Sequence, residues 1–155
     1  MRVYLVQHGE AQPKKVDPDR HLTPRGTGAV QRVAEFLKPL ELCVRAIWQS
    51  GKPRARQTAE LLAAGVSARD GIVERPGLGP NDDVEPIAQA IVEAGEDAMV
   101  VGHLPFLGRL AAQLVAGDAD VGIVAFRYGG VVCMEQQDDR DWRIAWMVTP
   151  ATLGR

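Results

Sequence analysis

Hydrophobic and polar positions along the chain divide it into short segments typical of an α/β fold. Apolar runs rich in β-branched residues predict strands near residues 2–7, 45–49, 98–102, 122–128, 130–135 and 142–148. Apolar residues at helical spacing predict helices over roughly 24–38, 53–65, 84–95 and 104–116. This order predicts strands alternating with helices, followed by a terminal antiparallel meander.

Local signals support the first helix and a long loop. Thr23 is expected to cap the helix, Pro24 suits its first position, and Pro39 ends it. The stretch 65–83 is rich in glycine and contains Pro76 and Pro80, so we expect an irregular loop over a pocket there.

Composition predicts one globular domain over residues 1–155. The chain is 46% hydrophobic and 25% charged, with a formal net charge of -2, so nothing in its overall charge favours nucleic acid or a membrane surface as a partner. No signal peptide and no apolar stretch near the ~20 residues needed to cross a bilayer is found, which predicts a cytoplasmic protein. A monomer is favoured, although the sequence leaves the oligomeric state open.

The cysteines do not suggest a disulfide or a metal site. Cys43 and Cys133 are far apart, form no metal-binding motif, and lie among apolar residues. We expect both to be reduced thiols in the core.

Two predicted strands each end in a histidine. His8 follows the first apolar run and His103 follows the run at 98–102. Ligands of open α/β sheets bind outside the carboxyl ends of the strands, so these two imidazoles can face one pocket. This pattern predicts an active site.

Two further segments carry groups that suit an anion. The polar loop 17–26 contains Arg20, and the segment 50–58 places Arg54 where a strand ends and a helix begins. Helix N-termini bind anions through free N–H groups, and arginine offers a planar set of donors that matches phosphate oxygens.

Together these motifs resemble the histidine phosphatase superfamily, in particular its short branch of bacterial phosphohistidine phosphatases of the SixA type. The resemblance rests on four segments in the family's order, which are His8-Gly9-Glu10-Ala11, Arg20-His21-Leu22-Thr23, Ser50 to Thr58, and Gly102-His103-Leu104-Pro105. It implies a phosphoglycerate-mutase-like three-layer sandwich, with a mixed, mostly parallel sheet and helices on both faces. It also implies a covalent phosphohistidine intermediate, no metal and no cofactor.

The chemistry assigns a role to each pocket residue. A neutral imidazole accepts a phosphoryl group well, so His8 is the expected nucleophile, with its other ring nitrogen bonded to a backbone carbonyl near Gly9. Arg20 and Arg54 are expected to bind phosphoryl oxygens, with His103 as a further donor. Gly9 is expected to let the main chain turn tightly beneath the phosphate.

Position 7 departs from the family pattern, which has arginine immediately before the nucleophile. Gln7 donates N–H bonds but carries no charge, and charged hydrogen bonds are roughly twice as strong as neutral ones. Two hypotheses follow: the remaining cations suffice for turnover, or the protein is a weakly active or inactive phosphate-binding regulatory module. Turnover is the preferred interpretation.

The leaving group favours a phosphorylated protein as substrate. Phosphohistidine expels an imidazole, which needs a weaker general acid than a phosphate ester does. No clear general acid is found, although Asp83, its neighbour Asp82 or Glu10 could assist or contact substrate. A phosphohistidine-bearing protein is therefore expected, with a small-molecule phosphomonoester as the alternative.

A metal hydrolase is a rival hypothesis. It would use His8, His21 and His103 with Asp17 or Asp83. These residues lack the short helical spacing of common metal motifs, so we expect no metal.

Overall fold

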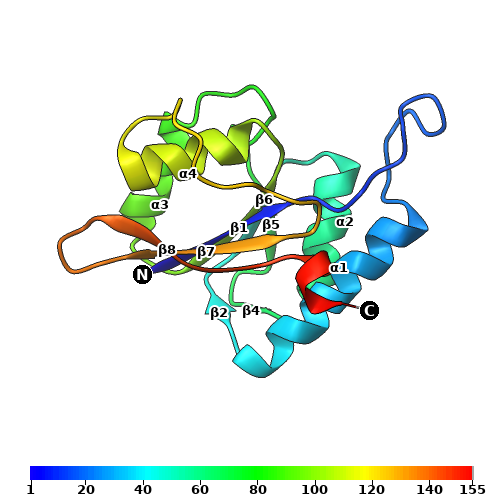
Figure 1. The fold of residues 1–155 in the computed structure, drawn as a ribbon, viewed down its shortest axis with the longest axis horizontal. Helices are drawn as coiled ribbons and strands as arrows, with labels where there is room; N and C mark the ends of the chain where they lie inside the picture. The colour runs from blue at the N-terminus through cyan, green and yellow to red at the C-terminus, as the bar shows by residue number, and fades with distance from the viewer. Residues whose placement is uncertain (155) are drawn as a thin grey trace.

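The computed structural model describes residues 1–154 and shows a sheet between two layers of helices (Figure 1). The strands of the main sheet are β1 (Arg2–Gln7), β3 (Ile47–Gln49), β5 (Ile72–Glu74), β6 (Ala98–Gly102), β7 (Val131–Gln136) and β8 (Trp142–Val148). The α-helices are α1 (Pro24–Leu37), α2 (Pro53–Leu62), α3 (Glu85–Ala94) and α4 (Phe106–Ala116). Short elements complete the described part, namely η1 (Lys38–Leu40), β2 (Cys43–Val44), β4 (Ser67–Ala68) and η2 (Pro150–Leu153).

The main sheet is mixed and mostly parallel. Its order is β5-β3-β6-β1-β7-β8, in which the first four strands run parallel and β7 pairs antiparallel with both β1 and β8. The register pairs Gln7 of β1 with Gly102 of β6. The residues that follow these two positions, His8 and His103, therefore emerge side by side at one edge of the sheet.

Successive side chains along each strand point to opposite faces of the sheet, and each face packs into its own hydrophobic core. Val3 and Leu5 face the layer of α3 and α4, whereas Tyr4 and Val6 face α1 and α2. All four are almost fully buried, as are the strand residues opposite them in β6 and β7. The three-layer fold predicted from the sequence is confirmed.

The start of α1 follows the predicted capping pattern. The Thr23 hydroxyl accepts a hydrogen bond from the Gly26 N–H at 2.8 Å, and Pro24 occupies the first turn. The helix ends at Leu37, and Pro39 lies in the short η1 that follows.

Three sequence predictions were wrong. Residues 122–128 form no strand, because Val124 and Phe126 pack against the core beside α3 and α4 while the segment stays outside the strand order of the main sheet. The stretch 65–83 is not wholly irregular, since it contains β4 and the edge strand β5, each too short for a clear pattern. Cys43 is exposed because it lies on the two-stranded sheet β2–β4 at the surface, whereas Cys133 is buried as expected.

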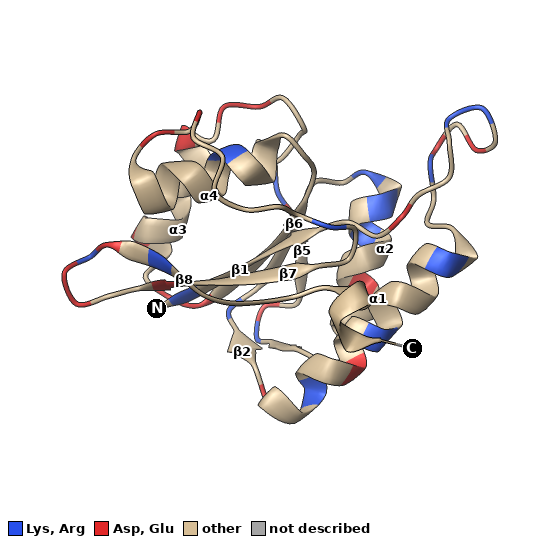
Figure 2. Ribbon diagram, in the orientation of Figure 1, with Lys and Arg blue, Asp and Glu red and all other residues tan. Residues whose placement is uncertain are grey.

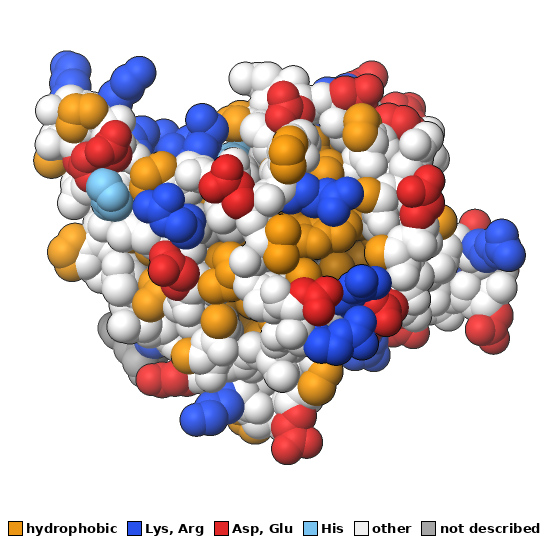
Figure 3. Space-filling view, turned by 180° about the vertical axis from the view of Figure 1, so that it is seen from behind, with side chains coloured by type: hydrophobic (Ala, Val, Ile, Leu, Met, Phe, Trp, Pro, Cys, Tyr) orange, Lys and Arg blue, Asp and Glu red, His pale blue; other side chains and the backbone are white. Residues whose placement is uncertain are grey.

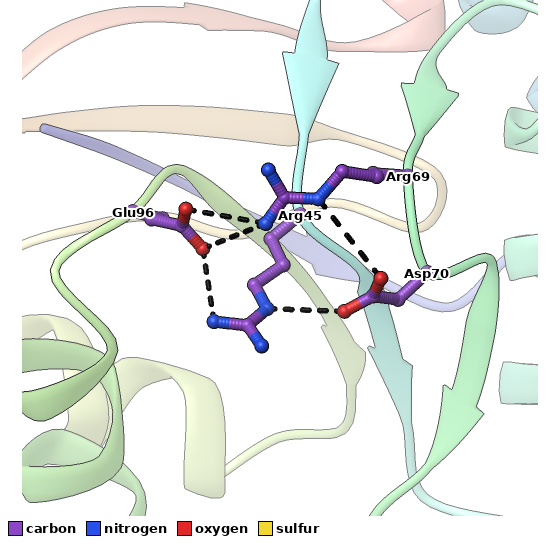
Figure 4. Close-up of polar contacts among 4 residues, drawn as sticks. All are labelled: Arg45, Arg69, Asp70 and Glu96. Atoms are coloured by element: carbon purple, nitrogen blue, oxygen red, sulfur yellow. Dashed lines mark hydrogen bonds and ion pairs between the residues drawn. The ribbon is translucent and has the colours of Figure 1, made fainter.

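An ionic cluster joins the small sheet to the main one (Figure 4). The Arg45 guanidinium contacts Asp70 and Glu96 at 3.0 Å each, and Arg69 contacts Glu96 at 3.1 Å. The four side chains are largely solvent-exposed, so their pairing ties segments together but contributes little stability.

Candidate active site

His8 lies at the carboxyl end of β1 with one ring nitrogen committed to the backbone. Its Nδ1 is 2.7 Å from the Gly9 carbonyl oxygen, so Nδ1 carries the proton and donates it there. Burial lowers the pKa of His8 to about 4, the Gly9 carbonyl opposes this, and the Arg54 and Arg20 cations lower it further. The ring is neutral at physiological pH, with the lone pair on Nε2.

His103 lies beside His8 at the end of β6. The two ring centroids are 5.1 Å apart, and both residues are buried. His103 Nε2 is 2.6 Å from the Ser50 hydroxyl oxygen, whereas Nδ1 is shielded from solvent and has no hydrogen-bond partner within residues 1–154. Burial lowers the pKa of His103 to about 3, with the neighbouring His8 and Arg54 as further causes.

Arg54 enters the site from the first turn of α2. Its Nε is buried without a hydrogen-bond partner in the described part of the chain. Burial lowers the pKa of Arg54, and the neighbouring Arg20 acts in the same direction. A buried guanidinium that lacks an anionic partner is a position that a bound anion would satisfy. Arg56, two residues on, is exposed, because residues i and i+2 of a helix do not share a face.

Arg20 reaches the same region from the loop before α1, in the strained left-handed conformation with φ of 52°. Its Nε donates to the Gln12 carbonyl at 3.0 Å. It forms no ion pair with Asp17 or Asp19 among the described residues, because Asp17 instead accepts from the His21 ring at 2.8 Å. Figure 2 shows basic residues both in this loop and at the start of α2.

Gln7 is buried at the end of β1, 8% exposed. Its Oε1 is shielded from solvent and has no hydrogen-bond partner in residues 1–154. The site therefore combines the Arg20 and Arg54 cations with two neutral histidines and an uncharged amide.

Gly9 serves the site through packing. A Cβ there would lie 2.9 Å from Val30 Cγ2 of α1, so only glycine lets the helix approach this closely. The Gly9 N–H donates to the Thr58 hydroxyl at 2.9 Å, and Thr58 in turn donates to the Arg54 carbonyl at 2.7 Å. Both backbone polar groups of Gly9 are thus occupied, and the residue positions His8 and Arg54 rather than offering its N–H to a ligand.

The candidate acids have structural contacts. Glu10 accepts from the Thr23 hydroxyl at 2.9 Å and so supports the start of α1. Asp83 accepts from the Glu85 N–H at 3.1 Å just before α3, and Asp82 accepts from the Gly79 N–H.

Gln57 connects the loop that carries Arg20 to α2. Its side-chain oxygen accepts a hydrogen bond from the Leu22 N–H at 2.8 Å.

Tyr128 is a neighbour of the site that the sequence did not reveal. Its ring centroid lies 5.6 Å from that of His8, and the residue is 48% exposed. The irregular segment that carries it is fixed by the Gly129 N–H, which donates to the Gln7 carbonyl at 2.9 Å. The adjacent glycines at 129 and 130 mark only the end of the predicted strand 122–128, so no sequence signal placed Tyr128 beside His8.

Possible metal ligands are not gathered at the histidines. Within the described residues, the potential ligand cluster consists of Asp17, Asp19 and His21 in the loop before α1, and it includes neither His8 nor His103. The set of ligands required for the rival metal-hydrolase hypothesis is therefore not assembled.

A separate groove of about 440 Å³ is lined in part by Arg45, Asp70 and Glu96 of the ionic cluster, on the face seen in Figure 3. Its floor includes Trp48, and the Arg75 guanidinium stacks 4.2 Å from the centre of that ring. No histidine of the described chain lines this groove, so it offers no imidazole for phosphoryl transfer.

Comparison with known proteins identifies the family. A profile described as histidine phosphatase superfamily (branch 1) matches residues 3–79. An uncharacterised protein of Picosynechococcus is 32% identical, with 90% of this chain and 92% of the relative covered. Phosphohistidine phosphatase SixA of Escherichia coli is 25% identical, with 99% and 96% covered.

This chain belongs to the histidine phosphatase superfamily. The solved structure of the protein histidine phosphatase SixA complexed with tungstate matches with a TM-score of 0.86 at 25% identity, covering 99% of each chain. An α-ribazole-5'-phosphate phosphatase structure from Escherichia coli matches with a TM-score of 0.76 at 18% identity, covering 97% of each chain, which shows the shared fold alone. Membership and the similarity to SixA make the chain a phosphatase. No helix of residues 1–154 is long and apolar enough to span a membrane.

Proposed function

We propose that this phosphatase removes phosphate from phosphohistidine on a protein, through a covalent phosphohistidine intermediate on His8, without a metal. The observation that carries the proposal is the 2.7 Å contact between His8 Nδ1 and the Gly9 carbonyl. It fixes the proton on Nδ1 and leaves the Nε2 lone pair beside the Arg20 and Arg54 cations.

The reaction then proceeds in two displacements. In the first, His8 Nε2 forms a bond to phosphorus while the bond between phosphorus and the substrate imidazole breaks, and the leaving imidazole takes up a proton from solvent. In the second, water attacks the phosphorus on His8, which releases inorganic phosphate and restores the neutral ring. Arg20, Arg54 and His103 stabilise the phosphoryl oxygens in both transition states.

The choice of leaving group rests on the contacts of the three candidate acids. Asp82, Asp83 and Glu10 all accept hydrogen bonds from neighbouring backbone or side-chain groups. A phosphoserine alkoxide needs a strong general acid, whereas an imidazole leaves readily because its conjugate acid has a pKa of about 6.5. The similarity to SixA over nearly the full chain also supports a phosphohistidine substrate.

The test uses a protein carrying radiolabelled phosphohistidine, with a phosphoserine peptide and p-nitrophenyl phosphate as alternative substrates. We expect phosphate release from phosphohistidine, an acid-labile label on the enzyme, and unchanged turnover in a chelator. His8→Ala should abolish both the label and turnover, whereas His103→Ala should slow the reaction and still accept label. Label on His8→Ala, or a preference for either ester, would contradict the proposal.

Gln7 favours one second candidate, a phosphate-binding regulatory module. The amide carries no charge where the superfamily pattern has an arginine, so stabilisation of the transition state is weaker. A small phosphoramidate separates the two: a module binds it without transferring its phosphoryl group, whereas the enzyme becomes labelled on His8.

A further inference from the structure

Ser50 links two neighbouring strand ends. It follows β3 directly, and β3 pairs with β6 so that Gln49 lies opposite Val101. This register brings the Ser50 hydroxyl to His103, with 2.6 Å between Oγ and Nε2.

A second contact favours donation from Ser50 to His103. The Lys52 backbone N–H donates to Ser50 Oγ at 3.4 Å, so the hydroxyl oxygen already accepts at the beginning of α2. Within residues 1–154, His103 Nε2 is the acceptor within reach of the hydroxyl proton. Donation from Ser50 to Nε2 therefore pairs all the polar groups at this point.

We infer that Ser50 is a positioning residue that donates its hydroxyl proton to Nε2 of His103 and so holds the neutral ring with its own proton on Nδ1, directed at a phosphoryl oxygen. The inference deepens the proposed function and rests on it. It explains why Nδ1 of His103 is buried with no partner among the described residues, because a bound phosphoryl group supplies the acceptor.

The opposite tautomer would oppose anion binding. With the proton on Nε2, His103 would present the Nδ1 lone pair to a phosphoryl oxygen, and the Ser50 proton would lack an acceptor among residues 1–154. Protonation of both nitrogens is disfavoured by burial and by the nearby Arg54, Lys52 and Arg20 cations, which lower the pKa of His103.

Both histidines are then protonated at Nδ1, but they turn different ring nitrogens toward the substrate: His8 turns Nε2 and His103 turns Nδ1. His8 donates from Nδ1 to the Gly9 carbonyl and offers a lone pair to phosphorus. His103 accepts at Nε2 from Ser50 and offers an N–H to oxygen. A backbone carbonyl sets the first arrangement, and a side-chain hydroxyl sets the second.

Nitrogen-15 NMR of the two rings near neutral pH tests the inference without any substrate. In the wild-type protein we expect both histidines protonated at Nδ1. Ser50→Ala should populate the Nε2-protonated form of His103, whereas His8 stays unchanged as an internal reference because Gly9 still holds it. A wild-type His103 protonated at Nε2 would overturn the inference by itself, even if the variant does not fold.

Inhibition by tungstate supplies the functional readout. Ser50→Ala should weaken tungstate binding by about tenfold, roughly the value of one hydrogen bond to a charged group, and Ser50→Thr should restore both affinity and tautomer. Ser67→Ala makes the same change at an exposed position in β4 and should alter neither. Unchanged tungstate affinity and tautomer in folded Ser50→Ala would overturn the role. Failure to hydrolyse phosphohistidine would instead contradict the proposed function and leave these two readouts unaffected.

Discussion

At the scale of single residues, the candidate site combines a few cations with several buried neutral side chains. His8 and His103 are both neutral, and Gln7 stands where the superfamily pattern has a cation. The positive charge around these rings comes from Arg20, Arg54 and Lys52, and Arg20 and Arg54 approach from separate elements. A dianionic phosphoryl group matches the charge of these two guanidinium groups.

Position 7 gives the first residue-level prediction. Gln7→Arg adds a charged donor beside His8, so phosphate and tungstate should bind about tenfold more tightly or better. Turnover need not rise, because an added charge that binds the substrate and the transition state equally well leaves the activation barrier unchanged. Tighter binding of the phosphate product can also slow its release. Competitive inhibition constants for phosphate measure the effect. An unchanged constant in a folded variant would mean that residue 7 does not face the phosphoryl group.

The depressed histidine pKa values give a second prediction. Folding lowers the pKa of His8 to about 4 and that of His103 to about 3, from an ordinary value of 6.5. Between these values the unfolded chain binds protons that the folded chain does not, so the free energy of unfolding rises with pH through this window and levels off above about 6.5. Stability is therefore lost as the pH falls from about 6.5 toward about 4.

Urea unfolding across this window checks the sign. His103→Gln removes one titrating ring and keeps an amide at the position, so its stability should depend less steeply on pH than that of the wild-type protein. Equal slopes would show that His103 titrates normally in the folded state.

At the scale of elements, close contact between α1 and the segment after β1 holds His8 in place. The helix approaches so tightly that a Cβ at Gly26 would lie 2.2 Å from the Glu10 carbonyl oxygen. Glu10 follows Gly9 directly, and its carbonyl also accepts from the Thr23 N–H at 3.0 Å. The start of α1 and the backbone that bears His8 are therefore packed as one unit.

A matched pair of glycines in α1 tests this packing. Gly26→Ala must displace the helix from backbone atoms, so we expect destabilisation of about 1–3 kcal/mol and a fall in activity. Gly28→Ala meets no atom within 4 Å and should stabilise the helix by about 0.5–1 kcal/mol with activity retained. Thermal unfolding and turnover of both variants check the pair, and equal effects of the two changes would contradict the packing argument.

At the scale of the whole molecule, the sheet separates two cores, and the cysteines report on one of them. Cys133 lies in the core shared with α1 and α2, whereas Cys43 is exposed on β2. Burial raises the pKa of the Cys133 thiol to about 11. Because the thiolate is the reactive form, this cysteine is inert while the fold is intact.

A thiol reagent should therefore modify Cys43 rapidly in the native protein and Cys133 only when the molecule opens. Time-resolved labelling with and without denaturant measures this. In Cys43→Ser the rapid phase should disappear. Rapid modification of Cys133 in native Cys43→Ser would show that the core between the sheet and α1 opens locally.

The sequence by itself determined the order of the main elements and the candidate pocket residues. The long strands and helices carry strong apolar periodicity, and the resemblance to the superfamily predicted the sandwich and the expected roles of His8, Arg20, Arg54 and His103. Signals of this kind are local, since each depends on residues close together in the chain. The strands β4 and β5 were missed because two or three residues are too few to show a periodic pattern. The segment 122–128 was predicted to be a strand because its apolar run looks the same whether or not it pairs with a neighbour.

Only the tertiary structure decided which polar atoms meet. The strand register placed Ser50 against His103, the packing of α1 made Gly9 a spacer with occupied backbone groups, and the fixed loop before β7 brought Tyr128 to His8. It also exposed Cys43 and assigned Glu10 and Asp83 to structural hydrogen bonds. These contacts join residues distant in sequence, and their partners are chosen by the burial of two cores and the pairing of backbone groups across strands.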